Sequence, residues 1–160
     1  MTSKIVSAMI EYFGSDIRRI NHFLKVLAFA KTIGEGEGLD TRTLQILEAA
    51  AAVHDIGIKN SEQKYNSSSG AYQQLEGPPE ARMLLEGLGC DEELTDRVCH
   101  LVSRHHTYEG VDGIDYRILL EADFLVNAFE DDLSEDAIRS AYDKIFRTNT
   151  GKNILRVMYL

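Results

Sequence analysis

Stretches of helix-forming residues, with apolar side chains three or four positions apart, alternate along the chain with short breaks that contain Gly, Ser or Pro. This spacing places the apolar side chains on one face of a helix. It predicts helices over residues 3–13, 17–33, 41–57, 78–89, 91–106 and 116–131, one that begins after Ser134, and a short last one over 154–160. We therefore expect an all-α protein, a compact bundle of about six to eight helices.

Residues 59–77 break this pattern because they are polar and rich in Ser and Gly. We interpret them as a long loop of the kind that often covers a substrate. Pro78 and Pro79 follow, and they suit the first turn of the next helix, where a missing N–H group is tolerated. The preceding helix is expected to continue to Gly57, a residue suited to a helix carboxyl end.

A length of 160 residues with 44% hydrophobic residues is enough for one domain that needs no disulfide bonds. We expect a single domain over residues 1–160. Its core would occupy residues 16–130, and the C-terminal helices over 134–160 would pack on that core. Apolar residues near the carboxyl end leave a monomer and a homodimer both open.

The charge balance is acidic, with 17 basic and 26 acidic residues and a net charge of −9. This argues against binding to a nucleic-acid backbone or an anionic membrane, which clustered Lys and Arg would hold. No stretch approaches the roughly 20 apolar residues of a membrane span, and no signal-peptide pattern occurs. Cys90 and Cys99 do not form a CxxC pair, so free thiols and a cytoplasmic location are expected.

Ionisable residues interrupt the apolar faces of four predicted helices. His22, Asp55, His105 and Asp123 each occupy a position where the periodicity asks for a hydrocarbon side chain, and His54 precedes Asp55. A buried carboxylate without a partner costs several kcal/mol, so these groups need one another or a cation. Imidazole and carboxylate ligands without thiolate favour Mn²⁺, Fe²⁺, Co²⁺, Ni²⁺ or Zn²⁺, with Mg²⁺ as a further option.

The same residues carry a family resemblance. The order His22, His54-Asp55 and Asp123, with the motif HDIG at the end of an Ala-rich helix and EAD before an apolar helix, resembles the HD-domain superfamily of metal-dependent phosphohydrolases. The similarity extends from about residue 16 to residue 130. It implies that His22, His54, Asp55 and Asp123 ligate one divalent metal ion.

Many members of that superfamily have two further histidines that hold a second metal ion together with the bridging Asp. Where one of them usually stands, this chain has Glu76, ahead of Gly77-Pro78. The other falls near the end of the fifth predicted helix, where His105 and His106 are both candidates. A site with one ion and a site with two, the second including Glu76, are therefore both open.

The resemblance implies hydrolysis of a phosphoester by a metal-activated water, with a small phosphorylated compound such as a nucleotide as substrate. Asp55 is then central to catalysis. Lys59, four residues later, is a candidate to contact the substrate phosphate, and Glu76 is a candidate to orient or deprotonate the water. Tyr65 and Tyr72 are candidates to stack on a nucleobase.

Other interpretations compete with this one. The first is a di-iron oxygenase of the HD type, which would need the full histidine set. The second is a non-catalytic module that binds a nucleotide or a metal ion, and the third is an interaction bundle without metal. The acidic run over residues 130–136 is interpreted as a solvated helix junction.

Overall fold

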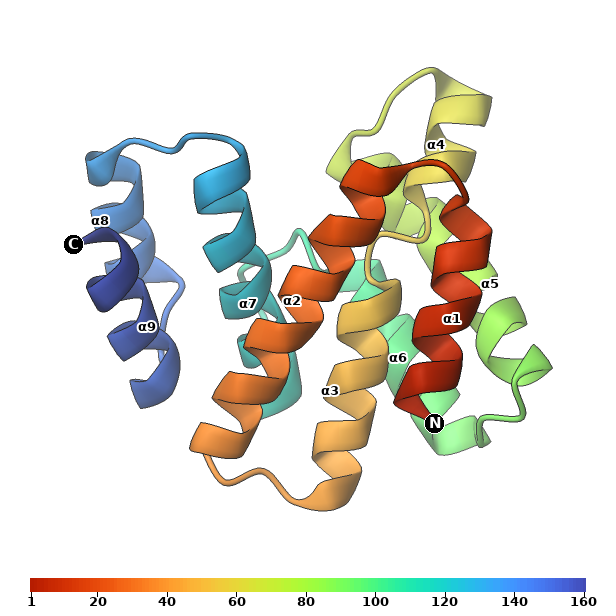
Figure 1. Cartoon of the computed structure of the whole chain (residues 1–160), viewed down its shortest axis with the longest axis horizontal. Helices are drawn as coiled ribbons and strands as arrows, with labels where there is room; N and C mark the ends of the chain where they lie inside the picture. Colours follow the sequence, from red (N-terminus) through yellow and green to blue (C-terminus); the bar gives the residue numbers. More distant parts are fainter.

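A computed structural model describes all 160 residues as nine α helices without a β strand (Figure 1). The helices are α1 (Thr2–Phe13), α2 (Ile17–Gly36), α3 (Thr41–Val53), α4 (Ile58–Tyr65), α5 (Gly70–Gly87), α6 (Glu92–Arg104), α7 (Ile114–Glu130), α8 (Glu135–Lys144) and α9 (Asn149–Tyr159). The predicted all-α class is confirmed. None of the nine combines the length and the apolar composition that a membrane crossing requires.

Five helices begin at a side chain that caps them. Asp16, Asp40, Asp91, Ser134 and Thr148 each accept a hydrogen bond from the main-chain N–H three residues later. Such a cap satisfies one of the N–H groups that the first turn leaves without a partner, and contributes about 1 kcal/mol. The short polar breaks of the sequence therefore define where these helices start.

Helix α2 lies at the centre of the fold, between α3 and α7 (Figure 1). Helix α3 also contacts α1 and α6, α6 pairs with α5, and α4 packs on α5. The α8–α9 pair lies at the opposite end of the molecule from α4 and α5. One continuous apolar cluster runs through all the helices except α4, from Ile5 in α1 to Leu155 in α9.

The predicted helix over 41–57 is too long, because α3 ends at Val53 and His54–Gly57 form a turn. Gly57 explains how this turn fits against α5. A Cβ atom on Gly57 would lie 2.6 Å from the main-chain N of Gly77 and 2.7 Å from the main-chain O of Gln73. Only glycine permits this approach, which holds the His-Asp turn close to α5.

The predicted loop over 59–77 is also wrong, because α4 and the first half of α5 occupy it. Helix α4 buries only Ile58 and Ser61, so it lacks the apolar periodicity that would have revealed it. Pro78 and Pro79 lie inside α5 and not in its first turn. Pro79 has no N–H group to donate to the carbonyl of Leu75, four residues earlier. Both residues are exposed, so this gap in the helical hydrogen bonds lies at the surface, where water can satisfy the carbonyl.

Glu121 joins α7 to the start of α9. Its side chain is fully buried, and it accepts hydrogen bonds from the main-chain N–H of Arg147 at 2.7 Å and of Thr148 at 3.0 Å. The Thr148 hydroxyl donates a third at 2.5 Å. The carboxylate therefore satisfies the buried N–H and hydroxyl of Thr148 and the N–H of Arg147 at its edge.

We predict that Glu121→Ala lowers the free energy of unfolding by about 3 kcal/mol, because buried N–H groups lose their acceptor. Urea denaturation measures this change. The control is Glu135→Ala, which removes an exposed pair with Arg139 and should cost well under 1 kcal/mol. Equal losses for the two variants would contradict the role assigned to Glu121.

Candidate metal centre

Four side chains from three parts of the chain converge at the centre of the bundle. His22 comes from α2, His54 and Asp55 from the turn after α3, and Asp123 from α7. The Nε2 atom of His22 lies 3.2 Å from Nε2 of His54, 3.1 Å from Oδ1 of Asp123 and 3.3 Å from Oδ2 of Asp55. These are the four residues that the sequence groups together.

A second group adjoins the first through Asp55. The Oδ2 atom of Asp55 faces His22 and His54, whereas Oδ1 lies 3.3 Å from Nε2 of His105. His106 joins the second group, since candidate ligand atoms of Asp55, His105 and His106 all lie within 4.8 Å of one another. Asp55 therefore has one carboxylate oxygen directed to each group.

The two adjacent histidines reach the same group because neither lies in a helix. Helix α6 ends at Arg104, so the angle of about 100° between successive helical side chains does not separate His105 from His106. Their ring centroids lie 3.9 Å apart. The sequence offered them as alternatives, and the structure brings both next to Asp55.

Main-chain carbonyls orient two of the rings. The Nδ1 atom of His54 donates to the carbonyl of Ala51 at 2.7 Å, and that of His105 donates to the carbonyl of Val102 at 2.8 Å. Both bonds reach three residues back, at the carboxyl end of a helix. A proton on Nδ1 leaves the Nε2 lone pair directed at the centre, as a metal ligand requires.

Glu130 orients His22 in the same way, and the sequence interpretation missed it. Its Oε2 atom lies 3.0 Å from Nδ1 of His22, and its Oε1 atom pairs with Lys25 at 2.6 Å. The acidic run was interpreted as solvated, yet Glu130 follows Asp123 by seven residues, which is two helical turns and the same face of α7. This spacing could have placed Glu130 on the same side of α7 as Asp123, beside the metal centre.

The charges of the centre shift the pKa values of its members in opposite directions. Burial alone would lower the pKa of His54, but the carboxylates of Asp55 and Asp123 raise it well above its usual range. Burial alone would raise the pKa of Asp55, but His54 and His105 hold it well below its usual range. Burial and the neighbouring His105 lower the pKa of His106 to about 4. Without a metal ion, His54 therefore carries a proton that pairs with the carboxylates.

The donor set fits a divalent metal ion. The buried Nε2 atom of His105 makes no hydrogen bond, although such atoms in folded proteins nearly always have a partner. Its neighbours are carboxylate oxygens and imidazole nitrogens, the ligand types that Mn²⁺, Fe²⁺, Co²⁺, Ni²⁺ and Zn²⁺ take. His22, His54, Asp55 and Asp123 could hold one ion, and Asp55, His105 and His106 a second.

Glu76 and Lys59, expected at this centre, have other partners. Glu76 is buried, but its oxygens accept hydrogen bonds from Lys64 and from the hydroxyl of Tyr65, each at 2.9 Å. The Nζ atom of Lys59 donates to the main-chain O of Tyr12 at 3.2 Å and lies over the ring of the same residue. The structure brings neither side chain to the histidines or aspartates of the two groups.

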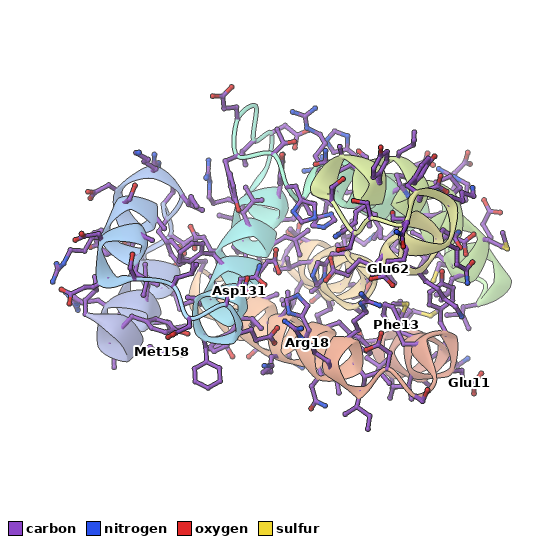
Figure 2. All side chains as sticks on the ribbon, turned by 90° about the horizontal axis from the view of Figure 1, so that it is seen from above. Glu11, Phe13, Arg18, Glu62, Asp131 and Met158 are labelled. Atoms are coloured by element: carbon purple, nitrogen blue, oxygen red, sulfur yellow. The ribbon has the colours of Figure 1, made fainter.

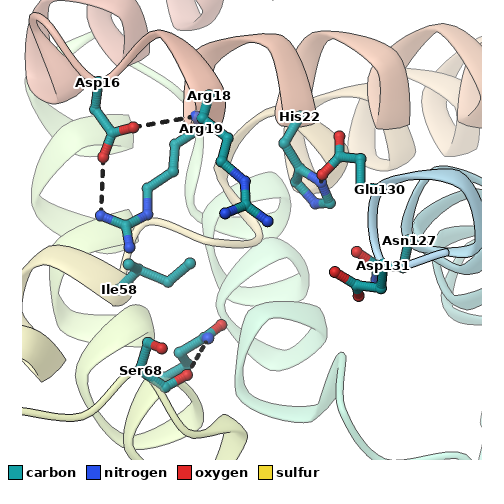
Figure 3. Close-up of a pocket in the computed structure, with 10 residues that line it drawn as sticks. Asp16, Arg18, Arg19, His22, Ile58, Ser68, Asn127, Glu130 and Asp131 are labelled. Atoms are coloured by element: carbon teal, nitrogen blue, oxygen red, sulfur yellow. Dashed lines mark hydrogen bonds and ion pairs between the residues drawn. The ribbon is translucent and has the colours of Figure 1, made fainter.

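A cavity of about 310 Å³ lies beside His22 (Figure 3). Its walls come from the start of α2, the end of α7 and the segment around the start of α5. Gln73, one of the lining residues, has its Oε1 atom 2.9 Å from Nε2 of His106. The cavity is therefore lined by one candidate ligand of the first group and by a partner of the second group.

Comparisons with known proteins identify the family and the fold. The sequence pattern of the HD domain matches residues 19–145. A solved structure of a predicted HD superfamily hydrolase from an uncultured Thermotogales bacterium is similar, with a TM-score of 0.71 and 24% sequence identity over 98% of this chain and 84% of that one. No curated protein matches the chain significantly.

The match over most of the length shows that the chain belongs to the HD domain family. The similar solved structure supports the same fold. Family membership and the two His/Asp groups together support a place among the metal-dependent hydrolases.

We predict that Glu130→Gln weakens metal binding about 10- to 100-fold, because His22 loses the carboxylate that orients it. Calorimetric titration of the metal-free protein with Mn²⁺ measures the affinity. Asp132→Asn is the matched control, since Asp132 is an exposed neighbour outside the centre. Unchanged affinity in Glu130→Gln would show that His22 needs no such support.

We also predict that the metal-free protein loses stability as the pH rises above 6.5. Burial lowers and the carboxylates raise the pKa of His22 and His54, with a net rise above the usual 6.5. Groups of this kind stabilise the fold below 6.5 and lose that effect as the pH rises through their folded-state pKa values. His106 opposes this loss only slightly, since with a folded-state pKa of about 4 it is already neutral in the fold and at least half neutral in the unfolded chain from pH 6.5 upward.

Melting temperatures between pH 6.5 and 8.5, with a chelator and with Mn²⁺, test this prediction. The Mn²⁺-loaded protein should not show the loss, because metal ligands bind better as protons leave them. The variant His54→Asn should show a smaller loss than the wild type in chelator. A metal-free wild type that gains stability over this interval would contradict the prediction.

Proposed function

We propose that the protein is a metal-dependent phosphohydrolase that cleaves a phosphoester of a small phosphorylated compound. The observation that carries the proposal is the carboxylate of Asp55, whose two oxygens face two adjoining groups of candidate ligands. A cavity of about 310 Å³ is lined by His22, one of these candidate ligands. A divalent ion held by His22 would therefore lie at the wall of the cavity, where its positive charge would attract an anionic substrate.

A bound divalent ion would polarise a phosphoryl oxygen and lower the pKa of a coordinated water. The chain itself holds and orients the ligands. His54 and His105 are fixed by main-chain carbonyls, and His22 is fixed by Glu130. Because these contacts exist before substrate arrives, little reorganisation is needed when charge develops on the phosphoryl group.

We expect the protein loaded with Mn²⁺, Co²⁺ or Ni²⁺ to hydrolyse simple esters such as 4-nitrophenyl phosphate, and Asp55→Ala to reduce this rate to that of the metal-free protein. Asp55 is the only residue whose carboxylate faces both groups. The release of inorganic phosphate measures the reaction. Asp96→Ala is the control, because Asp96 is an exposed partner of Arg82 outside the centre.

Two results would contradict the proposal. One is the absence of turnover by the metal-loaded protein across a broad panel of phosphoesters. The other is dioxygen consumption by the iron-loaded protein without phosphate release, which would favour an oxygenase. Elemental analysis of the same samples ensures that a negative result comes from protein that holds metal.

A further inference from the structure

The cavity beside His22 is polar. Of its ten lining residues only Ile58 is hydrophobic, and none is Phe, Tyr or Trp. Small-molecule sites are more often lined by apolar and aromatic side chains with a few polar groups. A ligand of this cavity must therefore offer hydrogen-bonding groups on most of its surface.

Two lining residues carry charges that the protein itself leaves without a partner. Arg18 makes no ion pair and its guanidinium group points into the cavity (Figure 3). By contrast, Arg19 pairs with Asp16 at 2.8 Å and with Glu62. Arg18 is therefore the cation available to an anionic group of a ligand, and guanidinium groups bind phosphate with two parallel hydrogen bonds.

The opposite wall offers groups that suit hydroxyls. Asp131 makes no ion pair, and Asn127 lies one helical turn before it on α7. Glu130 between them is committed to His22 and Lys25. A carboxylate accepts two hydrogen bonds from neighbouring hydroxyls, and an amide can donate and accept. In Figure 2 the labelled Arg18 lies on α2, and the labelled Asp131 lies at the end of the neighbouring helix α7, directly after its last residue.

The spacing along the two helices orders these groups outward from the candidate metal centre. Arg18 lies four residues before His22 on α2, and Asn127 and Asp131 lie four and eight residues after Asp123 on α7. Positions four apart share a helix face. A phosphate at the centre would thus meet Arg18 on one wall, and the rest of the ligand would meet Asn127 and Asp131 on the other.

The aromatic side chains that could stack on a nucleobase are engaged elsewhere. The rings of Tyr65 and Tyr72 stack on each other, with centroids 4.1 Å apart and an interplanar angle of 9°. Neither residue lines the cavity. A base in the cavity would therefore have no phenylalanine, tyrosine or tryptophan ring to stack on.

We propose that the cavity takes a polyhydroxylated phosphate monoester, such as a sugar phosphate or a polyol phosphate, and not a nucleotide. Arg18 holds the phosphate, and Asp131 and Asn127 bind the hydroxyls. This inference rests on the proposed function. In the reaction, water attacks phosphorus, the P–O bond to the sugar breaks, and a proton from the water passes to the leaving oxygen, giving the free polyol and inorganic phosphate.

The first test compares kcat/KM for glucose 6-phosphate, ribose 5-phosphate and glycerol 3-phosphate with the values for nucleoside monophosphates, using the Mn²⁺-loaded full chain. We expect the best polyol ester to exceed every nucleotide by about tenfold or more, the effect of one or two well-placed hydrogen bonds. Nucleotides turned over as well as, or better than, the polyol esters would overturn the inference and leave the proposed function standing.

Variants test the two walls separately. Arg18→Met should raise KM for all phosphate esters about tenfold or more, whereas Arg139→Met, on the remote helix α8, should not. Asp131→Asn should lower kcat/KM for glucose 6-phosphate more than for 4-nitrophenyl phosphate, which has no hydroxyls to bind. Asp132→Asn is the matched control. Equal effects of Asp131→Asn on both substrates would contradict its role.

A binding measurement tests the inference even if the protein hydrolyses none of these esters. Calorimetry of the metal-loaded chain should detect glucose 6-phosphate, and Arg18→Met should weaken this binding while Arg139→Met retains it. Binding without any hydrolysis would overturn the proposed function alone. Absence of binding, or equal binding of adenosine monophosphate, would overturn the inference.

Discussion

The structure depends on the burial of the Asp55 carboxylate among three histidines. Its oxygens lie 3.3 Å from Nε2 of His22 and of His105 and 3.4 Å from Nε2 of His54. An isolated carboxylate at this depth would be strongly unfavourable, so its partners must be held in place. The turn after α3, the end of α6 and the first half of α2 are therefore fixed relative to one another by charge as well as by apolar packing.

This constraint explains features of the fold that packing alone does not require. The His-Asp turn can approach α5 only because Gly57 has no side chain where it meets the main chain of Gln73 and Gly77. His54 and His105 sit where helices α3 and α6 have just ended, and each bonds a carbonyl of its own last turn. The carboxyl ends of these helices therefore orient two histidines of the centre. The polar cavity lies next to His22, along α2 and the end of α7.

The sequence predicted those features of the fold and of the site that depend on the spacing of apolar residues. His22 and Asp123 interrupt clear apolar stripes, and the all-α class followed from the same pattern. Helix α4 was missed because it buries too little to show a period. Glu76 was expected at the centre because it stands where the family usually has a histidine. Lys64 and Tyr65 of the short helix α4 bind it instead, a contact that no local sequence pattern records.

The central claim is that the buried histidines and aspartates form a divalent metal centre. A crystal structure of the protein grown with Mn²⁺, with anomalous diffraction data above and below the Mn absorption edge, tests it most directly. We expect an anomalous peak at about 2.0–2.3 Å from Nε2 of His22 and His54 and from the carboxylates of Asp55 and Asp123. Well-ordered side chains at the hydrogen-bonding distances seen here, with no anomalous peak among them at saturating Mn²⁺, would contradict the claim.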